Sequence, residues 1–158
     1  MYSDFKELLS IFNQQAVKYL IVGGYAVAEH AEPRFTKDLD IWVEASGENA
    51  KRVFGALQSF GAPLSGLTEA DFSREGSFYQ MGRPPARVDI LMSIDGVGFE
   101  DAWANRVEAD FGGITTSFIS RKDLITAKKA AGRPQDLIDV ENLILAEKIS
   151  EKLKRKKR

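Results

Sequence analysis

Two aspartates lie two residues apart inside an apolar segment, DLDIWVE at residues 38–44. Aspartate is depleted in β-strands, because its short polar side chain competes for backbone hydrogen bonds and packs poorly on a pleated surface. Residues two apart in a strand point to the same face, so Asp38 and Asp40 are expected side by side, with Leu39 and Ile41 pointing into the core. Two carboxylates at this separation repel each other, and the pattern therefore predicts a cation between them.

A third aspartate, Asp89, interrupts a second apolar segment, RVDIL. If this segment is a strand beside the first, its carboxylate joins the other two. Carboxylates are preferred ligands of Mg2+ and Mn2+, and a cluster of three is able to hold two ions for in-line attack on phosphorus. The alternative is a solvated strand edge with scattered acids, which we find less favoured because strand interiors disfavour aspartate. The predicted metal ligands and catalytic residues are Asp38, Asp40 and Asp89.

A glycine pair, Gly23 and Gly24, stands between the apolar run KYLIV and the helix-forming segment YAVAEHAE. The first N–H groups of a helix have no partner within the helix, and the helix dipole is positive there. The absence of side chains on the glycines would let phosphate oxygens approach these N–H groups. The pair therefore predicts a phosphate site for an NTP, with a tight strand-to-helix turn as the alternative.

The hydrophobic periodicity predicts elements in the order α-β-α-β-α-β-β-α-β-β-α-α, in one domain that spans residues 1–158. This order combines one βαβ unit, within residues 18–44, with two hairpins, and it indicates an α/β (α+β) domain in which helices flank a mixed sheet. The C-terminal part, from about residue 120 onward, is predicted to be helical. The expected segments are 5–12, 18–24, 25–32, 38–44, 48–61, 77–82, 86–92, 99–106, 106–119 (a hairpin turning at Gly112-Gly113), 120–132 and 134–158.

The composition indicates a soluble globular protein, because 44% of the 158 residues are hydrophobic and 28% are charged. The net charge of −1 creates no general attraction to nucleic acid or to an acidic membrane. The absence of cysteine excludes disulfides and thiolate metal sites. The first residues lack the pattern of a signal peptide, and no apolar stretch approaches the roughly 20 residues that span a bilayer, so the sequence predicts a cytoplasmic protein without membrane contact.

Taken together, VGGYAVAEH, RFTKDLDIWV and VDIL resemble the minimal nucleotidyltransferases of the polymerase-β-like superfamily. That family combines an hG[GS] turn on a helix, a Dx[DE] pair on the next strand and an acidic residue on a later strand. RKDLITAKKAAGRPQDLIDVENL is similar to the C-terminal helices of bacterial nucleotidyltransferases related to the toxins of toxin–antitoxin pairs. The resemblance covers residues 19–145, and its specificity comes from the order and spacing of motifs that are weak alone.

The resemblance implies a nucleotidyltransferase fold and a metal-dependent transfer of a nucleoside monophosphate from an NTP, such as ATP, to a hydroxyl. It implies that the glycine pair binds phosphate, that Asp38 and Asp40 bind metal, and that Asp89 also helps to activate the attacking hydroxyl. Many family members have serine at the position of Gly24, which offers only its N–H group here.

Basic side chains near these motifs are candidates for neutralising phosphate charge. For Arg34 and Lys37, beside the aspartate pair, an ordinary charged loop is an equally good interpretation. For Lys128 and Arg133, nearer the C-terminus, an ion pair with Asp136 or Asp139 is an equally good interpretation. The four candidates are Arg34, Lys37, Lys128 and Arg133.

Three other features favour structural interpretations. His30, the single histidine, is predicted to be structural or to end its helix, because one histidine cannot form a metal cluster. Trp42 is predicted to be a partly buried strand residue rather than a platform for a base. The basic tail KLKRKKR is predicted to be a solvated helix end rather than an RNA site.

The sequence leaves the acceptor open among RNA (including a tRNA end), a protein side chain and a small molecule such as an antibiotic. Residues 65–87 are expected to shape the acceptor side of the site. A toxin-like role would bring a cognate antitoxin as partner. The alternative function is a catalytically silent nucleotide- or partner-binding module, and the presence of all three aspartates favours the enzyme.

Overall fold

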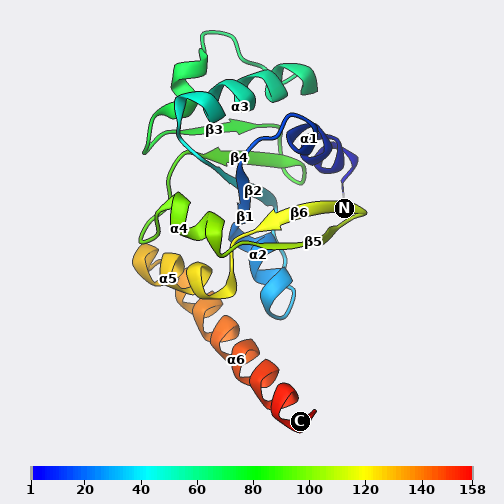
Figure 1. Cartoon of the computed structure of the whole chain (residues 1–158), viewed down its shortest axis with the longest axis vertical. Helices are drawn as coiled ribbons and strands as arrows, with labels where there is room; N and C mark the ends of the chain where they lie inside the picture. The colour runs from blue at the N-terminus through cyan, green and yellow to red at the C-terminus, as the bar shows by residue number, and fades with distance from the viewer. Residues whose placement is uncertain (1, 158) are drawn as a thin grey trace.

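The computed structural model describes residues 2–157, and its elements follow the predicted order (Figure 1). A short 3₁₀ helix, η1, lies between α3 and β3, outside the expected segments. The helices and strands are α1 (Ser3–Gln14), β1 (Tyr19–Val22), α2 (Gly23–His30), β2 (Asp38–Val43), α3 (Gly47–Phe60), η1 (Glu69–Ser73), β3 (Phe78–Met81), β4 (Arg87–Leu91), α4 (Phe99–Ala104), β5 (Val107–Phe111), β6 (Ile114–Phe118), α5 (Arg121–Ala131) and α6 (Pro134–Lys156).

Within residues 2–157, six strands form one mixed sheet in the order β3-β4-β2-β1-β6-β5. β2 is parallel to β4, and β1 is parallel to β6. The remaining neighbours are antiparallel, including the predicted hairpins β3–β4 and β5–β6. The mixed sheet with flanking helices confirms the predicted fold class.

The predicted βαβ unit is wrong, because β1 and β2 are antiparallel. α2 continues beyond the end of β1, and the chain then returns through residues 31–37, so β2 begins where β1 stops (Figure 1). In the resulting register, Val22 at the end of β1 lies opposite Asp40 near the start of β2. A parallel crossover would have placed the start of β2 beside the start of β1, away from the glycine turn. The antiparallel pairing therefore brings two of the sequence motifs together.

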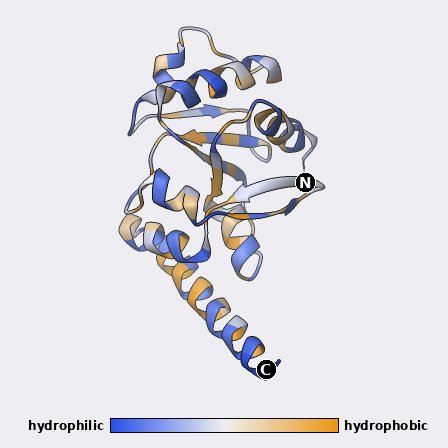
Figure 2. Cartoon of the chain, viewed as in Figure 1, coloured by the Kyte–Doolittle hydropathy of each residue, from blue (hydrophilic) through white to orange (hydrophobic). Residues whose placement is uncertain are grey.

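The central strands are buried on both faces, which explains their nearly continuous apolar sequences. Leu20, Ile21, Leu39, Ile41 and Ile90 are fully buried. Figure 2 shows that the hydrophobic residues concentrate in the strands at the centre of the domain. α1 and α3 pack against each other, whereas α2, α5 and α6 form a second helical group near the end of β1 (Figure 1).

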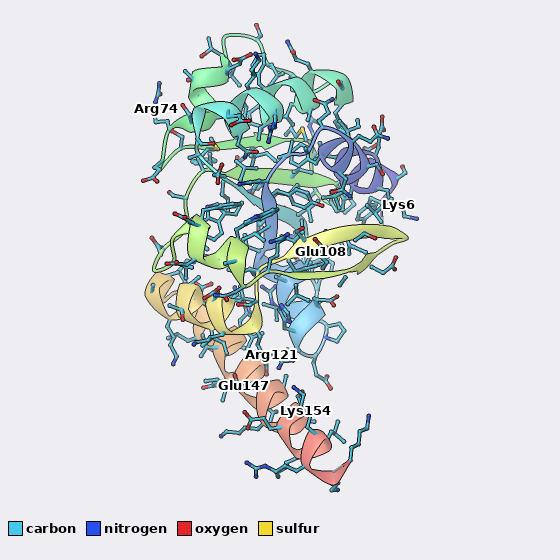
Figure 3. The ribbon with its side chains drawn as sticks, viewed as in Figure 1. Lys6, Arg74, Glu108, Arg121, Glu147 and Lys154 are labelled. Carbon is cyan, nitrogen blue, oxygen red and sulfur yellow. The ribbon has the colours of Figure 1, made fainter. Side chains whose placement is uncertain are left out.

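The two C-terminal helices begin and end as their sequences predict. The Ser120 side chain accepts a hydrogen bond from the N–H of Asp123 and caps α5, and Gly132 ends α5 with a positive φ of 66°. Pro134 is the first residue of α6. Arg121 (labelled in Figure 3) donates to the carbonyl oxygen of His30 at 3.1 Å, which ties the start of α5 to the end of α2.

The C-terminal half of α6 projects beyond the domain (Figure 1). Glu147 and Lys154 lie on this projecting part (Figure 3). Exposed apolar side chains, including Leu145 and Ile149, alternate there with charged ones (Figure 2). None of the helices in the described part of the chain has the length and apolar character needed to cross a membrane.

The buried side chain of Asn49 fixes the end of the β1–β2 ladder opposite the glycine turn. Its Oδ1 accepts the N–H of Lys18 at 2.8 Å, and its Nδ2 donates to the carbonyl oxygens of Lys18 and Glu44 at 3.1 and 2.9 Å. Lys18 precedes β1 and Glu44 follows β2, so one amide satisfies backbone groups of both chain segments. Asn49 thereby supports the register that sets Val22 opposite Asp40.

We expect Asn49→Ala to lower the free energy of unfolding by about 2–4 kcal/mol, because it leaves buried backbone groups without partners. Urea unfolding followed by circular dichroism measures this change. The matched control is Asn142→Ala, at an exposed position on α6, which should change the stability by less than about 0.5 kcal/mol. Equal effects of the two substitutions would contradict this role for Asn49.

Candidate active site

The three predicted aspartates lie on neighbouring strands and share one face of the sheet. β2 and β4 are parallel, and their register sets Asp40 opposite Asp89 and Asp38 opposite Arg87. Asp89 is buried, whereas Asp38 and Asp40 are partly buried. The structure therefore brings together the three carboxylates that the sequence pattern grouped.

Arg87 supplies the cation that the repulsion between these carboxylates requires. Its Nε and Nη2 donate to the two carboxylate oxygens of Asp89 at 3.1 and 3.0 Å. Its Nη2 also lies 3.7 Å from Oδ2 of Asp38. The sequence analysis did not identify Arg87, although the signal was present: Arg87 and Asp89 are two residues apart in a strand and must share a face.

A divalent cation fits part of this cluster. Oδ1 of Asp38 is buried and has no hydrogen-bond partner within residues 2–157, which is the condition of a ligand that lacks its cation. Across the same residues, no three histidine, cysteine, aspartate or glutamate side chains converge closely enough to hold a metal ion. Both oxygens of Asp89 accept hydrogen bonds from Arg87. Asp38 and Asp40 thus suit a metal ion in this arrangement, and Asp89 does not.

The carboxyl of Asp40 has a raised pKa, because it is crowded by the other two carboxylates and partly buried. Burial, and then the negative charges of Asp89 and Asp38, raise the pKa of Asp40 from 3.8 to about 7. The positive charge of Lys128 opposes this shift. Near neutral pH, Asp40 is therefore about half protonated. A cation bound beside it would favour the charged form and displace the proton.

The glycine pair allows side chains from β2 and the preceding loop to approach α2. Gly23 has a φ of +70°, and a Cβ atom there would overlap the carboxylate of Asp40. A Cβ atom on Gly24 would lie 2.6 Å from Oγ1 of Thr36. Both glycines are thus required for close packing of the turn, which gives them a role besides the predicted binding of phosphate by N–H groups. That phosphate contact stays a prediction.

A cleft of about 410 Å³ opens beside this cluster. One side comprises the end of β1, the glycine turn and β2, through Val22, Gly23 and Asp40. The other sides are the segment that follows β4 and the helices α5 and α6. These sides are formed by Leu91, Ser93, Ile94, Asp95, Leu124, Ala127, Lys128, Ala131, Arg133 and Asp136.

Buried aspartates of α6 bind three of the four predicted phosphate-binding cations. Asp139 is fully buried and accepts hydrogen bonds from Nε and Nη2 of Arg34 at 2.8 and 3.0 Å. Nζ of Lys128 lies 2.9 Å from Asp139 and 3.3 Å from Asp136. Arg133 binds Asp136 at 2.7 Å.

The predicted ion-pair interpretation is thus the one that the structure contains for Lys128 and Arg133. Arg34 also forms an ion pair, with Asp139, which the sequence analysis did not anticipate. The third nitrogen of Arg34, Nη1, donates to the carbonyl oxygen of Phe35 at 3.1 Å, so each nitrogen of this guanidinium makes one hydrogen bond. Lys128 still lines the cleft. Lys37 is exposed, and no ion pair involves it within residues 2–157.

His30 and Trp42 have structural positions. A ring nitrogen of His30 lies 2.7 Å from the carbonyl oxygen of Ile119, and burial lowers the pKa of the ring. Trp42 is more deeply buried than expected and packs edge-to-face on Phe99 in the core. Neither side chain is placed to contact a nucleotide in the cleft.

Comparison with protein families gives one match that covers almost the whole chain. Residues 2–156 match the family described as "Nucleotidyltransferase of unknown function (DUF6036)". A search of the curated proteins finds no match to this sequence.

Solved structures with a similar fold include three nucleotide-transferring proteins. The lincosamide antibiotic adenylyltransferase LnuA, bound to lincomycin, has a TM-score of 0.55 and 16% identity, over 90% of this chain and 96% of that one. ANT(2")-Ia, in complex with adenylyl-2"-tobramycin, has a TM-score of 0.56 and 16% identity, over 95% and 90%. A putative nucleotidyltransferase from Thermotoga maritima, TM1012, has a TM-score of 0.54 and 14% identity, over 96% and 91%. At these identities the likeness establishes the fold alone.

The raised pKa of Asp40 predicts that this residue destabilises the metal-free protein at neutral and higher pH. The folded state binds the proton more tightly than the unfolded chain does, so stability is lost as pH rises from about 4 to above 7. The loss amounts to at most about 4 kcal/mol. Asp40→Asn removes it, and we expect this variant to be more stable than wild type at pH 8 and equally stable near pH 4.

Urea unfolding in EDTA at pH 4, 6 and 8 measures the effect. Asp110→Asn, at an exposed position of the β5–β6 hairpin, is the control and should show no such gain. A stability difference between Asp40→Asn and wild type that does not grow with pH would contradict the assigned pKa.

Proposed function

Because this chain belongs to the nucleotidyltransferase family DUF6036, we propose that it transfers a nucleoside monophosphate from an NTP to a hydroxyl group in a metal-dependent reaction. The observation that carries this proposal is the strand register. It sets Asp40 opposite both Asp89 on β4 and Val22 on β1, so the carboxylate cluster and the glycine turn meet at Asp40, which lines the cleft with Val22 and Gly23.

The proposed nucleotide site combines the glycine turn with the aspartates of β2. The N–H groups of Gly23 and Gly24 open α2 and are proposed to bind the triphosphate. Asp38 and Asp40 are proposed to hold Mg2+ or Mn2+, which would supply positive charge to the phosphate oxygens. Support comes from the buried, unpaired Oδ1 of Asp38 and from the raised pKa of Asp40.

Lys128 is proposed to contact phosphate from the opposite side of the cleft. Its ammonium has three N–H donors, and the two ion pairs with Asp136 and Asp139 account for two of them. The third donor is available to an oxygen in the cleft that Lys128 lines. Arg34 is not among the residues that line the cleft, and its hydrogen bonds go to Asp139 and Phe35, so we propose that it fixes the loop of residues 31–37 instead.

In the proposed reaction, the oxygen of an acceptor hydroxyl attacks the α-phosphorus of the NTP. The bond between this phosphorus and its bridging oxygen breaks, and pyrophosphate leaves. The hydroxyl proton passes to the carboxylate cluster. Positioning and charge neutralisation supply most of the catalysis in phosphoryl transfer, so the main task of the protein is to hold the two substrates in line.

A hydroxyl-bearing small molecule is the acceptor class that we propose, with ATP as the nucleotide. LnuA is described as an antibiotic adenylyltransferase, and ANT(2")-Ia was solved with an adenylylated tobramycin. Neither the family match nor these structures lends support to an RNA acceptor, a toxin-like role or a cognate antitoxin, and these expectations stay predictions.

One observation favours the alternative of a catalytically silent binding module. Arg87 occupies both oxygens of Asp89, and no three-acid metal site is formed within the described residues. An enzyme and a silent module are both expected to bind ATP, so only turnover distinguishes them.

Transfer from α-labelled ATP tests the proposed function. Wild type with Mg2+ is expected to label at least one acceptor in a panel of lincosamides, aminoglycosides, other hydroxyl-bearing metabolites and total RNA. Asp40→Asn should lower the rate at least 100-fold, because it weakens the proposed metal site. Mass spectrometry of the acceptor would show the added nucleoside monophosphate.

Asp110→Asn is the control and should keep the wild-type rate, and EDTA should abolish labelling. Should wild type bind ATP in calorimetry yet label no acceptor, the silent module becomes the better account. Should Asp40→Asn label as fast as wild type, the chemistry does not depend on these aspartates.

A further inference from the structure

The guanidinium of Arg87 lies between two of the three carboxylates at the site. It makes two hydrogen bonds to Asp89, at 3.1 and 3.0 Å, and its Nη2 is 3.7 Å from Oδ2 of Asp38. A planar guanidinium matches the two oxygens of a carboxylate, which holds both groups in one geometry. Arg87 therefore bridges β4 to β2 at the position where a cation shared by Asp38 and Asp89 would have to bind.

The strand geometry makes this arrangement a property of the fold. Arg87 lies opposite Asp38 in the β2–β4 register and two residues before Asp89, so its side chain must project on the face that carries the carboxylates. The side chain of Arg87 is 33% exposed and that of Asp89 is 11% exposed. Asp89 is thus largely shielded from water, whereas Arg87 reaches it from the partly exposed edge of the site.

A metal ion shared by Asp38 and Asp89 is incompatible with this position of Arg87. In sites that hold two metal ions, the ions are about 3.5–4 Å apart and are bridged by shared ligands. A second ion here would meet a positive guanidinium within its ligand shell, while both oxygens of Asp89 accept hydrogen bonds from it. In agreement with this, no three-acid metal geometry is found within residues 2–157.

We propose that Arg87 replaces one of the two metal ions, so that the site binds a single divalent cation, at Asp38 and Asp40, with the guanidinium as its fixed second positive charge. This inference rests on the proposed function, because it assumes that Asp38 and Asp40 bind a metal ion. It assigns to Asp89 the role of holding Arg87, and to Arg87 a positioning role in the reaction.

Counting bound Mn2+ tests the proposal. Free Mn2+ is measured by electron paramagnetic resonance during titration of the full chain, with α,β-methylene-ATP present so that no turnover occurs. Wild type should bind one Mn2+ per chain. Arg87→Met keeps a side chain of similar length without charge, and it should bind two, or bind a second ion at least tenfold more tightly than wild type.

Arg83→Met is the matched control, because Arg83 is an exposed arginine of the same hairpin connection. It should bind one Mn2+, as wild type does. A thermal readout supplements the count. In EDTA, Arg87→Met should melt below wild type, because three carboxylates then lack a counter-ion, and saturating Mn2+ should raise its melting temperature more than that of wild type.

The outcomes separate this proposal from the proposed function. Two Mn2+ ions in wild type would overturn the role of Arg87 and leave the metal site standing. One ion in both wild type and Arg87→Met would also overturn it, because Arg87 would then not be what excludes the second ion. No Mn2+ binding by any variant would overturn the metal site at Asp38 and Asp40, and this inference with it.

Discussion

Three carboxylates on two adjacent strands concentrate negative charge at the middle of the sheet, and this charge is the constraint on which the arrangement of the site depends. Asp38 and Asp40 face Arg87 and Asp89 across the β2–β4 ladder, so repulsion cannot be relieved by moving one strand without breaking the sheet. The protein instead supplies one guanidinium, from Arg87, and tolerates a carboxyl at Asp40 whose pKa is raised to about 7. Such a cluster opposes folding and is typical of a site kept for binding or chemistry.

The helical C-terminal part also buries carboxylates, but there each carboxylate is paired with basic side chains. Asp139 is fully buried and is compensated by Arg34 from the loop before β2 and by Lys128 from α5. One carboxylate thus joins α6 to α5 and to the loop before β2, behind the wall of the cleft that Lys128, Arg133 and Asp136 line. Because every charged group in this network has a partner of opposite charge, the network makes this wall rigid. The cluster on β2 and β4, in contrast, has three carboxylates and one guanidinium and retains excess negative charge. The cleft therefore has one side whose charges are paired and one side, at Asp40, that belongs to a cluster with excess negative charge.

The position of the glycine turn follows from the direction of the strands. β1 and β2 are antiparallel, so the end of one and the start of the other lie at the same edge of the sheet. Asp40 then packs directly against Gly23, where any side chain would overlap its carboxylate. The glycine at position 23 is thus required by the close approach of Asp40, independently of the proposed phosphate contact. Asn49 supports this register from the opposite end of the ladder.

The sequence by itself determined the order of the elements, the fold class and the grouping of Asp38, Asp40 and Asp89, because periodicity and the rarity of aspartate in strands are local properties. Only the tertiary structure decided the direction of β2, since a helix after a strand permits either a crossover or a return. It also decided the partner of Lys128, for which sequence spacing left phosphate and ion pair equally open, and that of Arg34, for which it left phosphate and an ordinary charged loop open. The place of Arg87 between the carboxylates required the pairing of β2 with β4. Long-range pairing fixes which charges meet, and no local pattern along the chain contains that information.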